Sequence, residues 1–171
     1  MCLKLTSQLC SPSKLGWDAQ TARAPYLKRY ADKSNPPMAC NLTYSTLRIS
    51  SVEMSPDKIT EVIGISPTLI RRIEPDSKYR HRREFNYWAF STKELSNSTD
   101  NKEHIDIILN KLYGKQEQMD SLVKLKCSVD IFCFWNSTGQ GGPSMDVNLM
   151  RKLVQFGLNI SWDIYFDDES A

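Results

Sequence analysis

Residues 127–166 read CSVDIFCFWNSTGQGGPSMDVNLMRKLVQFGLNISWDIYF and contain a strand, a helix and a second strand. Apolar residues occupy both faces of the first strand, 127–135, which predicts a central position in a sheet. Apolar residues at helical spacing follow, and Gly157 can adopt the left-handed conformation that ends a helix. Apolar and polar residues alternate strictly in 158–166. This last pattern predicts a strand with one buried and one polar face.

Patterns upstream complete the sheet. They predict a strand at 42–51, a short helix at 55–64, two strands at 69–73 and 85–92 joined by a charged loop, and a helix that begins after Asp100 and divides near Gly114. The resulting order is β-α-β-β-α(α)-β-α-β. We therefore expect an α+β fold: a two-layer sandwich with a mostly antiparallel sheet of about five strands and about three helices on one face.

Residues 1–37 differ from the rest of the chain. They contain four of the eight prolines, show no helical or strand period, and carry six Lys and Arg against two Asp and Glu. This composition predicts a disordered N-terminal extension. Residues 38–171 then form a single α+β domain, and Met38 is a candidate for the true start of the protein. The domain alone has 16 basic and 18 acidic residues, so its overall charge does not indicate a nucleic-acid binder.

Composition excludes several classes of protein. The chain has 171 residues, 40% of them hydrophobic, and no apolar stretch of the roughly 20 residues that a membrane span needs. Its first ten residues lack the apolar block of a secretory signal, so we expect a cytoplasmic location. The five cysteines are irregularly spaced, which argues against a disulfide framework. Two histidines without ligand-like spacing give no support for a metal site, and no cofactor is expected.

Five segments taken in order resemble a known family. They read TLRISS, SPDKITEVIGISPT, YWAFST, FCFWNSTGQGGPSM and LNISWDIYFD. Together they resemble the uncharacterised, chiefly bacterial family known as domain of unknown function 4279, over about residues 42–167. The resemblance implies a stand-alone bacterial domain and brings no established activity. Small families of this kind are often proposed as immunity or antitoxin-like binders, which is an analogy only.

The glycine-rich loop 137–144 is the first candidate site. Gly141 and Gly142 could present backbone N–H groups to an anion near a helix start, beside Trp135 and Ser137. The loop lacks a lysine and matches no nucleotide-binding motif. A structural turn with Ser144 as the helix cap is therefore the favoured interpretation, and anion binding is the alternative.

The second candidate is the arginine-rich segment 71–83, which includes Arg72 and Arg83 and is interleaved with aromatic residues. Basic and aromatic residues together are typical of nucleic-acid binding. Because the rest of the domain is acidic, a solvated hairpin loop whose arginines pair with carboxylates is favoured over a nucleic-acid site. An acidic protein partner is the remaining alternative.

The third candidate lies on the polar face of the last strand, where Asp163 and Tyr165 are predicted to be exposed. Asp130 occupies the corresponding face of the preceding strand. If the two strands are neighbours, the carboxylates could act as an acid–base pair; the alternative is that both are simply solvated.

No constellation in the sequence identifies a reaction. The favoured hypothesis is a non-catalytic, cytoplasmic protein-binding module, of which an immunity-type neutraliser is one form. The alternatives are a binding domain or enzyme for a small anionic ligand, and then a nucleic-acid binder; no membrane association is expected. The candidate binding residues are Arg72, Arg83, Trp135, Ser137, Gly141, Gly142, Asp163 and Tyr165.

Overall fold

The computed structural model describes residues 40–138 and 141–166. The chain divides into two units, 1–37 and Met38–Ala171, and all described residues belong to the second. The predicted N-terminal extension and the candidate start at Met38 lie outside the described residues. No helix in the described part of the chain is long and apolar enough to cross a membrane.

The described elements follow the predicted order with one addition. They are β1 (Cys40–Ser51), α2 (Pro56–Ile63), β2 (Leu69–Arg71), α3 (Arg80–Glu84), β3 (Asn86–Ser91), α4 (Asn101–Leu112), α5 (Gln116–Lys124), β4 (Ser128–Ser137), α6 (Val147–Gln155) and β5 (Asn159–Phe166).

The strands form one five-stranded sheet in the order β2-β3-β1-β4-β5. β1 is antiparallel to both of its neighbours, β3 and β4, while β4 and β5 are parallel. The sheet is therefore mostly antiparallel, which confirms the prediction. Parallel neighbours need a crossover, and α6 supplies it between β4 and β5.

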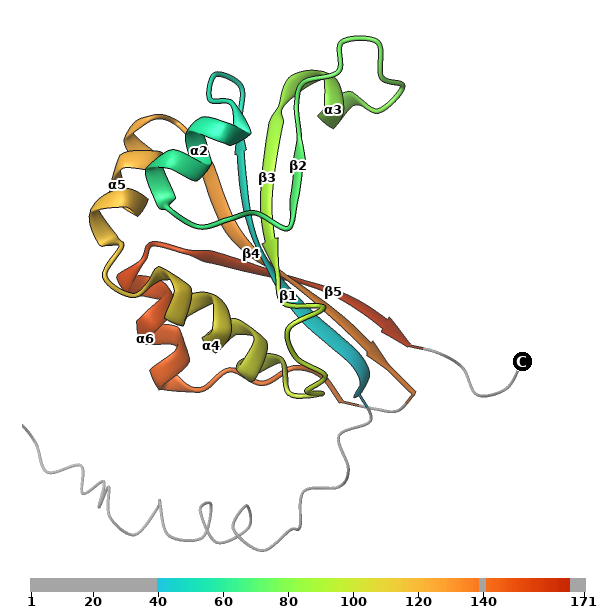
Figure 1. Cartoon of the computed structure of the whole chain (residues 1–171). Helices are drawn as coiled ribbons and strands as arrows, with labels where there is room; N and C mark the ends of the chain where they lie inside the picture. The colour runs from blue at the N-terminus through green and yellow to red at the C-terminus, as the bar shows by residue number, and fades with distance from the viewer. Residues whose placement is uncertain (1–39, 139–140, 167–171) are drawn as a thin grey trace, which may run out of the picture. The chain divides into compact units, whose positions relative to one another are not determined.

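Helices α2, α4, α5 and α6 cover one face of the sheet (Figure 1). Their apolar sides pack against alternate residues of the strands, and the fully buried side chains of this core include Leu47, Ile49, Trp88, Ile131 and Cys133. The predicted α+β two-layer architecture is confirmed. The helix predicted to divide does so at Gly114, which has a positive φ of 72° between α4 and α5.

Helix α6 begins two residues later than the sequence predicts. Asp146, not Ser144, is its cap, and the Asp146 carboxylate accepts a hydrogen bond of 2.9 Å from the backbone N–H of Leu149. A carboxylate also interacts favourably with the partial positive charge of a helix N-terminus. Asp146 is therefore the stronger of the two caps and fixes where α6 begins, and Ser144 belongs to the loop.

The connection between β2 and β3 is the main difference from the prediction. It contains the one-turn helix α3 where the sequence predicts a charged loop. No side chain of α3 is buried and Tyr79 provides no side-chain cap, so the usual sequence signals of a helix are missing. Ion pairs support the turn instead: Arg80 to Glu84 at 2.7 Å and Arg82 to Glu74 at 3.7 Å.

Beneath the sheet, polar side chains at one end of the core are buried and hydrogen-bonded. The Asn101 amide donates to the hydroxyls of Thr43 at 2.8 Å and Ser45 at 3.2 Å. Its carbonyl oxygen accepts from the Trp162 indole N–H at 3.3 Å. Asn101 is only 2% exposed, so these bonds offset the cost of removing its amide from water.

His104 extends the same network. Its Nε2 lies 2.9 Å from the carbonyl oxygen of Ser98, so Nε2 donates. Its Nδ1 lies 2.7 Å from the Thr92 hydroxyl. The Thr92 hydroxyl also donates to the carbonyl oxygen of Ser45 at 3.0 Å and accepts from the Ser45 backbone N–H at 3.0 Å.

The three described cysteines, Cys40, Cys127 and Cys133, are free and buried. Burial raises the pKa of the Cys133 thiol to about 11, so the thiol is neutral at pH 8. Because the thiolate is the reactive form, we expect iodoacetamide at pH 8 to leave Cys133 unmodified in the folded protein and to modify it in denaturant. Peptide mass spectrometry measures this, and rapid labelling of Cys133 without denaturant would contradict the burial.

Candidate functional site

The sheet face away from the helices carries the candidate site. Along a strand, side chains alternate between faces, so Arg48 points away from the core that its neighbours Leu47 and Ile49 enter. By the same alternation, this open face also carries Tyr87 on β3, Asp130, Phe132 and Phe134 on β4, and Asp163 and Tyr165 on β5. The sequence predicted this mixture of aromatic and acidic residues on an open face, and it did not predict the arginines among them.

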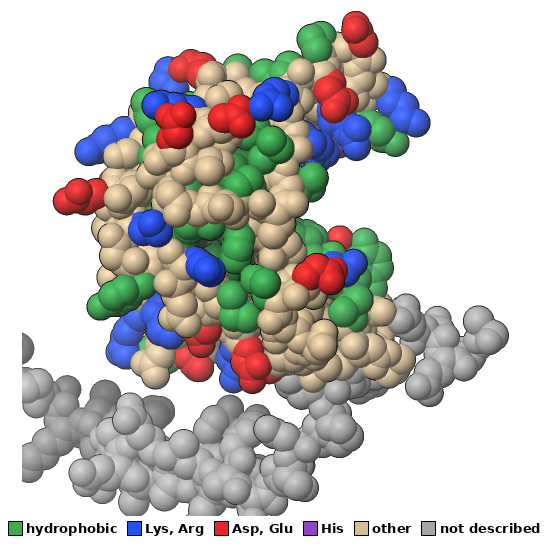
Figure 2. All heavy atoms as spheres, viewed as in Figure 1, with side chains coloured by type: hydrophobic (Ala, Val, Ile, Leu, Met, Phe, Trp, Pro, Cys, Tyr) green, Lys and Arg blue, Asp and Glu red, His purple; other side chains and the backbone are tan. Residues whose placement is uncertain are grey.

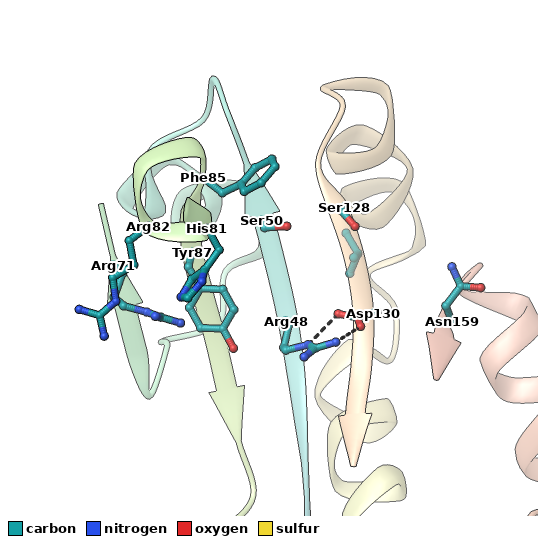
Figure 3. A pocket seen from close by; sticks show the side chains of 11 residues that line it. Arg48, Ser50, Arg71, His81, Arg82, Phe85, Tyr87, Ser128, Asp130 and Asn159 are labelled. Atoms are coloured by element: carbon teal, nitrogen blue, oxygen red, sulfur yellow. Dashed lines mark hydrogen bonds and ion pairs between the residues drawn. The ribbon is translucent and has the colours of Figure 1, made fainter. Parts of the chain in front are cut away.

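A cleft of about 490 Å³ lies on this face. It forms where α3, at the tip of the hairpin of β2 and β3, stands over the sheet. Its lining includes Arg48, Arg71, His81, Arg82, Tyr87 and Asp130 (Figure 3). Figure 2 shows the hairpin projecting from the body of the domain, with Lys and Arg side chains gathered on it and a hollow below. The hairpin supplies two of the three arginines, and the central strand β1 supplies the third.

Arg48 and Asp130 form an ion pair at the floor of the cleft. The Arg48 guanidinium donates through Nε to one carboxylate oxygen at 3.0 Å and through Nη2 to the other. The two strands are neighbours, with Arg48 directly opposite Asp130 in the register. The hydrogen bond to Asp130 raises the pKa of Arg48 further above its usual range. Nη2 also lies 3.5 Å from the Ser161 hydroxyl on β5, so the guanidinium reaches across β4.

Arg71 is held by an aromatic ring and not by a carboxylate. Its guanidinium carbon lies 4.5 Å from the centre of the Tyr87 ring, a cation–π contact. No carboxylate among residues 40–138 and 141–166 forms an ion pair with it. Burial raises the pKa of Tyr87, against the opposing effect of the nearby Arg48 and Arg71 charges. Arg71 therefore brings an uncompensated positive charge to the cleft.

Arg82 reaches the cleft from α3, next to His81. Its guanidinium lies 5.2 Å from the Tyr79 ring centre, and its ion pair with Glu74 is long, at 3.7 Å. Of the described residues that line the cleft, Asp130 supplies the one carboxylate, against three guanidinium groups. The cleft is therefore cationic on the surface of a domain that is acidic by composition.

Beyond the cleft, three aromatic rings cross the open face from strand to strand. The ring centres of Tyr44 and Phe134 are 5.0 Å apart, those of Phe134 and Tyr165 are 5.4 Å apart, and Lys93 lies over Tyr44. These spacings match the roughly 4.8 Å between neighbouring strands, so the rings stand upright and face one another. Rings that already stack on each other offer few free faces to nucleobases, which disfavours the nucleic-acid alternative.

The structure does not bring the predicted arginines to the glycine-rich loop. Arg72 pairs with Asp57 at 2.6 Å, and Arg83 donates to the carbonyl of Ser77 at 2.8 Å; neither lines the cleft. The tip of the β2–β3 hairpin lies at the end of β1 where Ser51 pairs with Asn86. The glycine-rich loop lies at the opposite end of β1, where Cys40 pairs with Ser137. An anion site built from both is therefore wrong in its geometry.

The remaining candidates are also separate from the cleft. Trp135 and Ser137 are buried, at 3% and 1% exposure, and Gly141 and Gly142 are exposed beyond the end of β4. Neither Trp135 nor the glycine-rich loop is part of the lining of the cleft that contains the arginines.

Asp163 and Tyr165 lie on the open face as predicted, and the Tyr165 hydroxyl donates to Asp163 at 3.0 Å. This hydrogen bond raises the pKa of Tyr165. Asp130 lies opposite Asn159, four residues along β5 from Asp163, a separation of about 13 Å at ~3.3 Å per residue. The two carboxylates cannot share a proton at that distance, so the predicted acid–base pair does not form.

The sequence reasoning missed Arg48, Arg71, Arg82 and Tyr87. One signal was available: Arg48 interrupts the apolar residues of TLRIS inside a strand, where a charge needs a partner. Arg71 and Arg82 belong to the arginine-rich segment that the sequence did indicate. Arg71 faces the cleft because it lies opposite Tyr87 in the register of β2 and β3, and Arg82 faces it because of α3, which had no sequence signal.

The described residues contain no group of three or more His, Cys, Asp and Glu side chains that could hold a metal ion. The fold and site together define a small α+β domain with a cationic cleft on the open face of its sheet. The chain belongs to the domain of unknown function family DUF4279, whose family model matches residues 41–167. Searches of curated proteins and of solved structures found no match.

Proposed function

We propose that this domain is a non-catalytic binding module that recognises an acidic segment of another protein in its cationic cleft. The observation that carries the proposal is the set of three guanidinium groups, with one carboxylate, around a cleft of about 490 Å³. Arg71 matters most, because it has no carboxylate partner among the described residues. A carboxylate of the partner would pair with it without displacing an existing ion pair.

The surroundings of the cleft support a protein partner. Beyond the cleft, the open face carries aromatic side chains, of which Phe134 is half-buried and Tyr165 is 49% exposed. Tyrosine and arginine are enriched among the residues that contribute most to protein–protein binding. Binding of this kind is proposed for the cytoplasm, and immunity-type neutralisation of a partner with an acidic surface would be one form of it.

A small anionic ligand is the second candidate, and the size of the cleft favours it. Small-molecule sites have volumes of about 300–1,000 Å³, and the cleft falls within that range. Such a ligand would use the same three guanidinium groups. It would not use the glycine-rich loop, which lies at the other end of the sheet.

Replacing Arg71 with alanine is expected to weaken binding of a hexaglutamate peptide by about tenfold or more, because it removes the unpaired charge of the cleft. Arg72→Ala is the matched control: it removes the same charge one residue away, from a side chain that pairs with Asp57 outside the cleft. Isothermal titration calorimetry of the full chain measures both, and Arg72→Ala should bind within about twofold of the wild type.

Two further titrants distinguish the alternatives. Binding of inorganic phosphate without hexaglutamate would favour the small anionic ligand. Binding of a mixed oligonucleotide that weakens steeply with salt would favour nucleic acid. Equal losses of peptide binding in Arg71→Ala and Arg72→Ala would overturn the cleft as the binding site, because a general loss of surface charge would then explain the result.

A further inference from the structure

The two edges of the sheet differ in how their backbone is protected. β2, at one edge, has three residues, and Pro67 and Arg72 lie close to its ends. β5, at the other edge, has eight residues and contains no Lys, Arg or Pro. Short strands, prolines and charges are the usual means of preventing an edge from pairing with another chain. β5 lacks the first two, and Asp163 is its one charged residue, so its outer row of N–H and C=O groups is available to another strand.

The side chains at the end of β5 are also left partly uncovered. Ile164, Tyr165 and Phe166 are 42%, 49% and 60% exposed. They alternate between the two faces of the sheet, so a strand laid along this edge would cover apolar surface on both. No strand among the described residues lies on this side of β5.

We propose that β5 pairs with β5 of a second copy of this chain, antiparallel and about a two-fold axis at Trp162, to join the two sheets. In an antiparallel pair, residues that lie opposite each other point to the same face of the sheet. When the two strands are identical, the two-fold axis must therefore pass between a residue and the same residue of the partner strand. An axis at Asp163 would oppose two carboxylates, which is unfavourable. The cleft shares Asn159 with β5, but its three arginines lie on other elements.

An axis at Trp162 gives complementary pairs along residues 159–165. Ile160 lies opposite the partner's Ile164 on the helix side of the sheet. Ser161 lies opposite the partner's Asp163 on the open side, where a hydroxyl can donate to the carboxylate. With a second copy of the chain, each of these residue pairs forms twice, because the two-fold axis repeats it. This self-complementarity is the reason for choosing a second copy as the occupant of the edge.

Sedimentation equilibrium of the full chain at micromolar concentration tests the proposal. The wild type is expected at twice the 19.6 kDa of one chain. Ile164→Lys is expected at the mass of one chain, because it places a charge against the partner's Ile160. Val154→Lys is the matched control: a lysine in place of another β-branched apolar residue, at a 78% exposed site on α6, should leave the dimer intact. Thermal unfolding of both variants shows whether each is folded.

Ser161 provides a test of the register with two variants at one exposed position. Ser161→Asp would face the partner's Asp163 and is expected to raise the dimer dissociation constant about tenfold, since the like charges repel at two symmetric sites. Ser161→Lys would face the same carboxylate and should lower the dissociation constant or leave it unchanged. Equal effects of the two variants would overturn the register.

Two other results would overturn the proposal as a whole. One is a wild-type mass of a single chain. The other is a dimer that persists in the folded Ile164→Lys variant, which would place the interface elsewhere. Neither result bears on the cleft, because peptide binding to the cleft is measured separately with Arg71→Ala.

Discussion

Replacing Trp88 with alanine is expected to lower the free energy of unfolding by about 3–5 kcal/mol, the range for large aromatic residues removed from a core. Trp88 is fully buried on β3, between β1 and β2, and lies opposite Ile49 in the register. Its indole N–H donates to the Thr60 hydroxyl of α2 at 3.0 Å. The side chain therefore joins the sheet to the helix layer. Its loss would leave a cavity and remove one of the two hydrogen bonds of the Thr60 hydroxyl, which also donates to the Pro56 carbonyl at 2.9 Å.

Chemical denaturation of the full chain measures this effect. Thr60→Val separates its two causes, since it removes the acceptor of the indole hydrogen bond and keeps the shape of the residue. We expect a loss of about 1–2 kcal/mol from Thr60→Val, since it also removes the hydrogen bond from the Thr60 hydroxyl to the Pro56 carbonyl, and each bond contributes about 1 kcal/mol net. A loss from Trp88→Ala no larger than that from Thr60→Val would show that Trp88 is not a central member of the core.

Replacing Asn101 with alanine is expected to lower the free energy of unfolding by about 2–4 kcal/mol, because it removes three hydrogen bonds and takes the acceptor from the Trp162 indole N–H. Asn101 bonds to Thr43, Ser45 and Trp162, which lie on β1 and β5, two strands separated by β4. One amide thus connects α4 to both strands. Its loss would destabilise the end of the core where these elements meet.

Asn110→Ala is the matched control, since it makes the same substitution at an exposed position of the same helix. We expect a change within about 0.5 kcal/mol there, because surface substitutions away from special features have small effects. Denaturation curves for the two variants should therefore separate clearly. If their midpoints coincide, the Asn101 network does not stabilise the fold.

The open face shows how far the sequence led toward the candidate site. Strict alternation in 158–166 predicted correctly that Asp163 and Tyr165 face away from the core. The same pattern could not show that Asp130 lies opposite Asn159, because register depends on the packing of the neighbouring strand. The predicted carboxylate pair failed for that reason.

The arginines of the cleft also could not be identified from the sequence, because they come from segments that are far apart in the chain. Their density in 71–83 is visible in the sequence, but the register of β2 against β3 turns Arg71 toward the cleft, and α3 does the same for Arg82. That single turn has no apolar face and no side-chain cap, so no periodic signal marks it. The glycine-rich loop was placed near the arginines only by assumption, and the sheet separates the two by the length of β1.

The sequence by itself determined the elements and their faces. The periods of two and 3.6 residues are local properties, and they marked the five strands, the amphipathic helices and the two-layer α+β architecture. Only the tertiary structure decided that β5 runs parallel to β4 at an edge, and that Arg48, Arg71 and Arg82 meet in one cleft. These arrangements join residues far apart in the chain, and they are fixed by the packing of one shared core rather than by any local pattern.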